Sequence, residues 1–318
     1  MTRERRRLRL GTRSSALALA QSRLVAAELE RLHPGIGVEL VSIVTRGDTT
    51  PGTLAALGGK GLFTAELEAG LLDGSIDLAV HSLKDLPVKL PAGLSIAAHP
   101  PREDPRDVLL SASAGTLDEL APGARVLTGS LRRRAQLLRR RGDLSVEDIR
   151  GNVDTRIRKW RESGAEALVL AAAGLRRLGI ESGAVGARPL PADVMIPAPG
   201  QGTLAIECRL DSPAFELCAA LDHEPTARAA RAERAVVAAF GADCTLPLGA
   251  WAREENGEKN RGIEGAAAVR LSVFLASRDG RRWLETTATG DTPESAAAVA
   301  VESLRSSGAQ AILDESAA

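Results

Sequence analysis

Four polar side chains directly follow a short apolar stretch near residue 80. The stretch from Ile76 to Val80 is brief and apolar enough to be a strand inside a parallel sheet, and after it come His81, Ser82, Lys84 and Asp85. In open α/β sheets, ligands bind at the carboxyl ends of the strands. A carboxylate and an ammonium placed there could hold a cation and an anion. An adjacent lysine and aspartate also occur as a solvated surface pair, and the residues alone leave both interpretations open.

The segment before this strand predicts a glycine-rich turn and then a helix. Three glycines surround Lys60, and residues 64–73 carry leucines at helical spacing. After the polar residues, Pro87 and Pro91 end regular structure. We therefore expect Asp85 to lie on a stiff loop at the edge of a sheet.

These two segments resemble the hydroxymethylbilane synthase family, which is also called porphobilinogen deaminase. The resemblance rests on GGKGLFTAELE at residues 58–68 and DLAVHSLKDLP at residues 77–87, and it extends over the chain from Leu8 onward. It implies that Asp85 is the catalytic group. It also implies carboxylate binding by Lys60 and Lys84, and places Phe63 and Ser82 in the site.

The composition favours a reduced, soluble, cytoplasmic protein. The chain has 318 residues, with 41 basic and 41 acidic side chains, so its global charge favours neither nucleic acid nor a membrane surface. The cysteines are Cys208, Cys218 and Cys244, a sparse set that suggests free thiols and no metal site. The basic start at residues 3–9 is followed by too short an apolar run for a signal peptide. No segment approaches transmembrane length.

The amino-terminal region predicts a βαβ unit. Residues 8–12 and 38–44 are expected strands, and residues 16–32 have apolar side chains near one face of a helix. This alternation predicts an α/β fold with a parallel sheet. The composition of residues 49–61 suggests a loop that could cover a site.

The turn between this first strand and helix offers an anion site. Gly11-Thr12-Arg13-Ser14-Ser15 combines free N–H groups, hydroxyls and an arginine before a helix amino terminus. Capping of the helix by Ser14 or Ser15 explains the same residues without a ligand. The family resemblance implies that Arg13 and Ser15 contact pyrrole side chains. Thr45-Arg46-Gly47-Asp48 also matches the family and adds Asp48 to the site.

A second α/β region begins after a run of prolines and charges at residues 100–107, which indicates a domain crossing. Strands are expected at residues 125–128, 146–149 and 167–171, and helices at residues 130–141 and 154–162.

This second region is strongly basic. From Arg125 to Arg161 there are eleven arginines and one lysine against four acids, an excess of eight positive charges. A solvated helix face is the expected role of Arg139, Arg140 and Arg141. Nucleic-acid binding lacks stacking partners, because Trp160 is the one aromatic residue in the segment. The third interpretation is a small polyanion held by guanidinium forks.

Arginines at expected strand ends support the polyanion. They follow three strands in turn, each time where a helix begins, and the family resemblance assigns carboxylate binding to the same set. The arginines are Arg132, Arg133, Arg150, Arg156 and Arg177, and the resemblance adds Thr128 and Ser130 to the carboxylate-binding residues.

The chain is then expected to return and to end in a smaller α+β domain. The proline-rich turn at residues 196–202 contains Gln201, which the resemblance places in the site. The expected domains are residues 8–101 with 202–221, residues 106–197, and residues 224–318. Two α/β lobes with crossed connections resemble type II solute-binding proteins.

Cys244 has two interpretations. Buried cysteines are usually inert, which fits Cys208 and Cys218. Cys244 lies in a tight loop without a neighbouring His or Lys, so the residues alone also favour a structural role. The context G-x-x-C-x-x-P-x-G at residues 241–249 resembles the cysteine that carries the dipyrromethane cofactor of the family.

The resemblance implies a transferase of tetrapyrrole biosynthesis. Four porphobilinogen molecules would be condensed, with loss of ammonia, on a dipyrromethane attached to Cys244, and hydrolysis would release hydroxymethylbilane. Ala56 and Gly129 stand where the family often has lysine and serine. We expect a monomer without nucleic-acid or membrane partners. The rival interpretation is a cytoplasmic type II solute-binding module for a small polycarboxylate.

Overall fold

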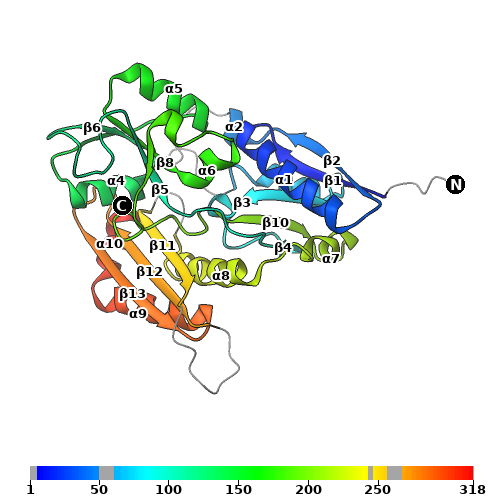
Figure 1. Ribbon diagram of the computed structural model, residues 1–318. Helices are drawn as coiled ribbons and strands as arrows, with labels where there is room; N and C mark the ends of the chain where they lie inside the picture. The colour runs from blue at the N-terminus through cyan, green and yellow to red at the C-terminus, as the bar shows by residue number, and fades with distance from the viewer. Residues whose placement is uncertain (1–5, 50–60, 243–245, 256–266, 318) are drawn as a thin grey trace. The chain divides into compact units, whose positions relative to one another are not determined.

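The computed structural model describes residues 6–49, 61–242, 246–255 and 267–317. The chain forms two compact units, residues 1–103 with 203–227 and residues 104–202 with 228–318. It therefore leaves the first unit, returns to it and leaves it again (Figure 1). Helices are labelled α and strands β as in Figure 1.

The first unit contains a five-stranded mixed sheet with the order β2-β1-β3-β10-β4. β1 is parallel to β2 and β3, whereas β10 is antiparallel to both of its neighbours. The strands are β1 (Arg6–Arg13), β2 (Ile36–Ile43), β3 (Leu78–Ser82), β4 (Leu94–Ala98) and β10 (Leu204–Arg209).

The two faces of this sheet are covered differently. One face packs against α1 (Ala16–Leu32) and α7 (Pro213–Ala219) in a core that includes Leu10, Leu78 and Ile206. On the other face, α3 (Ala65–Leu72) contributes leucines to a smaller apolar cluster. The smaller cluster leaves room on that face for polar side chains. A short helix, α2 (Arg46–Thr49), follows β2.

The second unit contains another five-stranded mixed sheet, with the order β7-β6-β8-β5-β9. β6 is parallel to β7 and β8, and β5 is antiparallel to β8 and β9. Its strands are β5 (Asp107–Ser111), β6 (Arg125–Leu127), β7 (Ser145–Glu147), β8 (Ala167–Ala171) and β9 (Ala187–Pro189).

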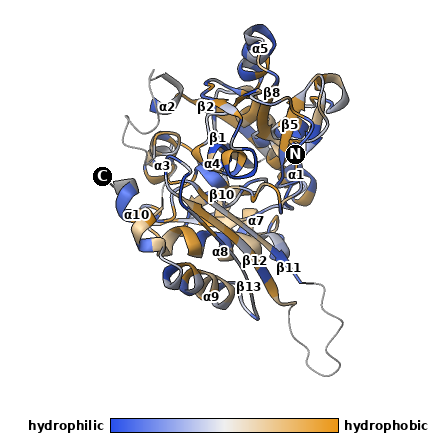
Figure 2. Ribbon diagram, turned by 90° about the vertical axis from the view of Figure 1, so that its left-hand side faces the viewer, coloured by the Kyte–Doolittle hydropathy of each residue, from blue (hydrophilic) through white to orange (hydrophobic). Residues whose placement is uncertain are grey.

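Three helices accompany this sheet: α4 (Leu131–Arg140), α5 (Val153–Ser163) and α6 (Ala172–Arg177). Strand β5, which lies between β8 and β9, is fully buried and is largely hydrophobic in colour in Figure 2, whereas α5 is largely hydrophilic. Ile157 and Trp160 are the buried side chains of α5 and dock it on the sheet.

The same unit also holds a three-stranded antiparallel sheet of β11 (Leu248–Glu254), β12 (Val269–Ala276) and β13 (Trp283–Gly290). Its apolar core is shared with α8 (Glu224–Ala239), α9 (Pro293–Ser306) and α10 (Ala309–Ala317). Thr292 caps α9 through a reciprocal capping box with Ser295.

The expected fold class is confirmed, because two α/β sheets with crossed connections are followed by a smaller α+β part. Sequence patterns located β3 two residues too early. They also did not predict the short helices α7 and α10 or the strands β4, β5 and β9. Among the described residues, no helix is long and apolar enough to cross a membrane.

Candidate functional site

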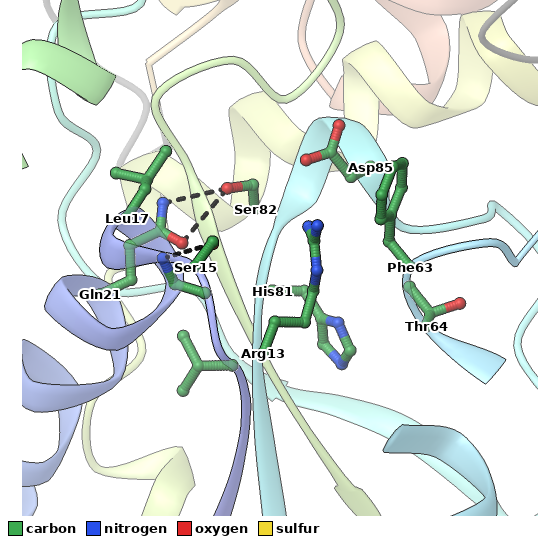
Figure 3. A pocket seen from close by; sticks show the side chains of 11 residues that line it. Arg13, Ser15, Leu17, Gln21, Phe63, Thr64, His81, Ser82 and Asp85 are labelled. Carbon is green, nitrogen blue, oxygen red and sulfur yellow. Dashed lines mark hydrogen bonds between the residues drawn. The ribbon is translucent and has the colours of Figure 1, made fainter. Parts of the chain in front are cut away.

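A pocket lies in the first unit where the parallel strands β1 and β3 end. Four segments line it: the end of β1, the start of α1 with the residue before it, the residues preceding α3, and the end of β3 with the turn that follows (Figure 3). Its lining residues are Arg13, Ser15, Leu17, Ala18, Gln21, Phe63, Thr64, Val80, His81, Ser82 and Asp85. The position agrees with the rule that open α/β sheets bind ligands at strand carboxyl ends.

Arg13, the last residue of β1, is oriented by an aromatic ring. Its guanidinium carbon lies 4.2 Å from the centre of the Phe63 ring, a cation–π contact. Phe63 can take this place because residue 47 is glycine, since a Cβ at Gly47 would lie only 2.2 Å from the ring. Gly47 therefore helps to orient Arg13 indirectly, by leaving room for the Phe63 ring.

Ser15 both caps α1 and lines the pocket. Its hydroxyl accepts a hydrogen bond of 3.3 Å from the backbone N–H of Ala18, so the capping interpretation is correct. The hydroxyl proton remains a donor for a ligand. The positive end of the α1 dipole adds an attraction for anions at this side of the pocket.

Ser82, the last residue of β3, is held by Gln21 of α1. The Gln21 side-chain amide donates to the Ser82 hydroxyl oxygen over 3.0 Å, as the dashed lines in Figure 3 show. The bond joins the helix to the strand end across the pocket. It therefore fixes the spacing of two pocket walls.

Asp85 lies in a single 3₁₀ turn, Leu83–Asp85, directly after β3. Leu83 is buried, and its N–H donates to the carbonyl of Thr203 over 3.0 Å, while the Leu86 N–H closes the turn on the Leu83 carbonyl over 3.1 Å. These two leucines hold the turn against the core. Asp85 is consequently exposed at the pocket on a fixed piece of backbone, and Lys84 beside it is half-buried.

Behind the pocket floor lies a buried group of ionisable side chains. Glu68 comes from α3, His81 from β3 and Glu207 from β10, and all are at least nine-tenths buried. The His81 Nε2 atom lies 3.0 Å from a carboxylate oxygen of Glu207. Burial and the neighbouring Glu207 raise the pKa of Glu68, against the opposing effects of Thr64 and His81.

In the second unit, Arg132 and Arg133 share one buried carboxylate. Each places a guanidinium nitrogen 2.8 Å from an oxygen of Asp107, the first residue of β5. Gln201 donates to the same carboxylate over 2.8 Å. Burial acts to raise the pKa of Asp107, but the two arginine charges and the hydrogen bonds outweigh it and hold that pKa far below its usual range.

Other predicted arginines also have protein partners. Arg150 is paired with Asp148 at 2.9 Å, and Arg177 donates to the carbonyl of Gly202 over 2.6 Å. Arg156 lies half-buried on α5.

Thr128 and Ser130 shape the start of α4. The Thr128 hydroxyl accepts from the N–H of Ser130, and the Ser130 hydroxyl accepts from the N–H of Arg133. These caps begin the helix that carries the paired arginines.

The expectation for residues 139–141 needs a correction. Arg139 and Arg140 are exposed, as expected, with partners Glu285 and Asp118. Arg141 is only partly exposed and donates to the carbonyls of Leu117 and Leu120 at 2.8 and 3.2 Å. It therefore fastens a loop and is not simply solvated, because its position at the end of α4 turns the side chain inward.

Three predicted positions cannot be placed. Lys60 and Cys244 lie outside the described residues, as does the side chain of Asp48.

The structure unites one part of the predicted set. Arg13, Ser15, Phe63, Ser82 and Asp85 line a single pocket in the first unit. In the second unit Arg132, Arg133 and Gln201 meet at Asp107.

Sequence patterns missed several residues that hold these groups. Gln21, Thr64, Asp107 and Glu207 were assigned no role. Asp107 and Glu207 offered a signal, since each is an acid in an otherwise apolar strand. An acid inside a fully buried strand needs a partner.

A two-lobed α/β protein with an ionic pocket at strand carboxyl ends is the class that these observations define. Two family models match the chain: "Porphobilinogen deaminase, dipyromethane cofactor binding domain" over residues 8–216, and "Porphobilinogen deaminase, C-terminal domain" over residues 227–305. The chain belongs to the porphobilinogen deaminase family.

Relatives match over nearly the full length. A porphobilinogen deaminase of Moorella thermoacetica is 46% identical over 312 residues, which cover 97% of this chain and 96% of the relative. One of Syntrophotalea carbinolica is 51% identical over 247 residues, covering 77% and 78%. Among solved structures, the methionine-binding protein MetQ is 14% identical with a TM-score of 0.43, covering 68% of this chain and 89% of MetQ.

Proposed function

We infer that this protein is a transferase of tetrapyrrole biosynthesis. It joins four porphobilinogen molecules head to tail, releases one ammonia per molecule, and frees hydroxymethylbilane by hydrolysis. Membership of the porphobilinogen deaminase family supports this reaction, and it does not favour the rival role of a solute-binding module. The observation that carries the mechanism is the exposed carboxylate of Asp85 on a rigid turn at the pocket, opposite Arg13.

The charges of the pocket match those of the substrate. Porphobilinogen has a pyrrole ring with two carboxylate side chains and an aminomethyl group. Arg13, the Ser15 hydroxyl and the α1 amino terminus attract a carboxylate. Lys84 follows on the turn beside Asp85 and binds a second carboxylate in this proposal.

In this proposal the Asp85 carboxylate stabilises positive charge that forms on the pyrrole rings. Departure of ammonia from porphobilinogen leaves a cation whose charge extends over the pyrrole nitrogen, and the attacking ring becomes cationic as the new carbon–carbon bond forms. The Asp85 carboxylate stabilises these charges and accepts the pyrrole N–H bonds. Because Leu83 and Leu86 fix the turn in advance, little reorganisation is needed during the reaction.

The second unit fits a group rich in carboxylates. Two buried guanidinium groups face the single carboxylate of Asp107, which leaves one positive charge uncompensated at that point, and the Arg132 Nε is buried without a hydrogen-bond partner among the described residues. We assign cofactor carboxylates to Arg132, Arg133, Arg150, Arg156, Arg177, Thr128 and Ser130. When bound, the dipyrromethane supplies the pyrrole end to which the first porphobilinogen is joined. Its attachment to Cys244 is part of the proposal.

Further parts of the proposal concern organisation. The three sheets support a division into residues 8–101 with 202–221, residues 106–197 and residues 224–318. Reduced Cys208 and Cys218 support a cytoplasmic location. The balanced charge gives no attraction for nucleic acid, and a monomeric state is part of the proposal.

Turnover of porphobilinogen tests the function. The purified protein should release four ammonia molecules for each hydroxymethylbilane formed, and its intact mass should exceed the polypeptide mass by that of dipyrromethane. Cys244→Ala should lose the added mass, while Cys218→Ala should retain it as the matched control. Stoichiometric binding of porphobilinogen without ammonia release would instead establish a binding module, and added mass on Cys244→Ala would refute the attachment site.

A further inference from the structure

The buried group of Glu68, His81 and Glu207 lies where the mechanism above places no chemistry. The three side chains are exposed by 9%, 5% and 0%, and they come from α3, β3 and β10. Together they could carry two negative charges and one positive charge. Ionised groups of this kind are costly in a protein interior unless they neutralise one another.

Sheet register explains why His81 and Glu207 meet. On the antiparallel pair β3 and β10, His81 lies opposite Ala205 and Glu207 lies opposite Ala79. His81 and Glu207 are therefore diagonal neighbours on one face of the sheet. The same face of the sheet is covered by α3. In this helix Glu68 lies one turn before Leu71 and Leu72, and it is buried against the sheet.

The hydrogen bonding of the group is incomplete. Within the described residues, the His81 Nε2, both Glu207 oxygens and one Glu68 oxygen lack a partner with good hydrogen-bond geometry. His81 Nε2 and a Glu207 oxygen are nevertheless only 3.0 Å apart. A proton between these two atoms satisfies both of them, whereas a bare carboxylate there would lose its solvation without compensation.

Proton counting selects the charge state. With Glu68 protonated, a proton on His81 beside an ionised Glu207 gives a neutral group, and moving that proton to Glu207 gives a neutral group again. Both arrangements hold the same number of protons. Loss of one proton leaves a net negative charge in the interior, so the group holds its protons firmly. The raised pKa of Glu68 agrees with this count.

The group is connected to the pocket through the chain. His81 itself lines the pocket, immediately before Ser82 and four residues before Asp85, and Thr64 lines it just before α3. In Figure 3 the His81 ring points away from Asp85 and toward the side of Thr64. His81 therefore acts on the reacting groups through the backbone that it anchors.

We propose that Glu207 and His81 are positioning residues for the reaction inferred above, joined with a protonated Glu68 in a neutral, proton-sharing group that fixes the pocket floor and the strand end leading to Asp85. The proposal rests on the proposed function for its kinetic effect. The protonation of His81 does not depend on turnover and can be observed separately.

Two matched substitutions separate positioning from packing. Glu207→Gln and Glu68→Gln make the same chemical change at two buried acids of one group. Glu207→Gln removes the acceptor of the shared proton, whereas Glu68→Gln retains the neutral form that the native group already uses. We expect kcat to fall roughly 10–100-fold in Glu207→Gln with KM changed by less than about 3-fold, because displacement of a reacting group mainly affects the chemical step. Glu68→Gln should keep kcat within about 3-fold of the native value.

Imidazole NMR supplies the second readout. In the native protein the imidazole N–H proton of His81, assigned by its loss in His81→Gln, should give a separate signal that exchanges slowly with water, because it is buried and shared with Glu207. In Glu207→Gln this signal should move, because an amide replaces the carboxylate that accepts the proton. The folded fraction and the cofactor-loaded fraction are measured by thermal unfolding and intact mass, so that kcat refers to intact molecules.

Several outcomes would overturn the proposal. Absence of a slowly exchanging His81 N–H signal in the native protein would exclude the shared proton, even if Glu207→Gln failed to fold. Equal losses of kcat in Glu68→Gln and Glu207→Gln would exclude the assigned charge state. Absence of any turnover by the native protein would refute the proposed function and with it the kinetic role, while the slowly exchanging His81 N–H signal would still establish the shared proton.

Discussion

Both five-stranded sheets place ionic side chains near strand ends, but they use them in opposite ways. In the first unit, Asp85 follows β3 on a fixed turn and is exposed at an open pocket. In the second unit, Asp107 begins β5 and is fully buried beneath Arg132 and Arg133. One carboxylate is available to a ligand, and the other is committed to orienting two arginines. Position in the topology therefore predicts where charges gather, whereas burial decides whether a carboxylate is available to a ligand or is held by arginines.

The largest effect expected from this contrast is on activity. Asp85→Asn keeps the shape of an exposed side chain and removes its charge, so kcat should fall roughly 10³-fold with little change in thermal stability. The change should appear in ammonia release by folded, cofactor-loaded protein. Near-normal turnover of such a preparation would remove Asp85 from the mechanism.

The same substitution at Asp107 should act on folding. Asp107→Asn leaves two buried guanidinium groups without their carboxylate, and we expect a loss of roughly 3–5 kcal/mol in the free energy of unfolding. Denaturant titration of both variants side by side measures the difference. If Asp107→Asn were as stable as Asp85→Asn, the distinction between a committed and an available carboxylate would fail.

The stability of the protein in acid should also depend on the contact of Asp107 with Arg132 and Arg133. The pKa of Asp107 is lowered in the folded protein, so its ionised form contributes stability that is fully present above the pKa of an unfolded aspartate. That contribution is lost as the pH falls toward the folded-state pKa. The free energy of unfolding of the native protein should therefore decrease from about pH 4 downward more steeply than that of Asp107→Asn. Parallel acid profiles would contradict this prediction.

A smaller effect is expected next to Arg150. A Cβ at Gly129 would lie 2.6 Å from the carbonyl oxygen of Ile149, so this chain has no room for the serine that the family often carries there. We expect Gly129→Ser to cost roughly 1–3 kcal/mol of stability, measured by denaturant titration. Gly123→Ala is unsuitable as a control because Gly123 has a positive φ, whereas Gly183→Ala has open space and an ordinary φ. Equal stability of Gly129→Ser and Gly183→Ala would show that the Ile149 carbonyl moves aside at little cost in stability.

The smallest effect should come from an exposed pair. Arg140 meets Asp118 at the surface, where solvent screens the ion pair and leaves it little effect on stability. Arg140→Ala should leave stability and turnover nearly unchanged, whereas Arg133→Lys keeps the charge but loses the planar fork that reaches Asp107 and the Val169 carbonyl. Stability and turnover are measured for both variants. Equal losses in Arg140→Ala and Arg133→Lys would contradict the division between buried and solvated arginines.

Much of the fold could be predicted because its periodic segments are local. The helix at residues 16–32 and the strand at residues 167–171 occur at the predicted bounds, since apolar spacing and flanking residues determine both. Strands β5 and β9 were missed, because they pair antiparallel with distant segments and are short or begin with a charged residue. Their strand character comes from partners that no local pattern records.

The site could be predicted in part for the same reason. Arg13 and Ser82 end strands and Asp85 follows one, so their place at a sheet edge could be inferred from the chain. The contacts that orient these groups could not. Ser82 is held by Gln21, and His81 by Glu207, through approaches that depend on helix packing and strand register. Long-range polar partners follow from the three-dimensional arrangement.

The insertion of β10 between β3 and β4 has a consequence for synthesis of the protein on the ribosome. Strand β4 ends at Ala98, and β10 begins only at Leu204. At about 5–20 residues per second, the chain needs roughly 5–20 s to make the intervening segment. During that time the edges of β3 and β4 have no strand between them, and His81 lacks Glu207. Exposed strand edges invite pairing with other chains. The nascent protein is therefore most vulnerable to aggregation in this interval, and the first sheet becomes complete only after every strand of the second sheet has been synthesised.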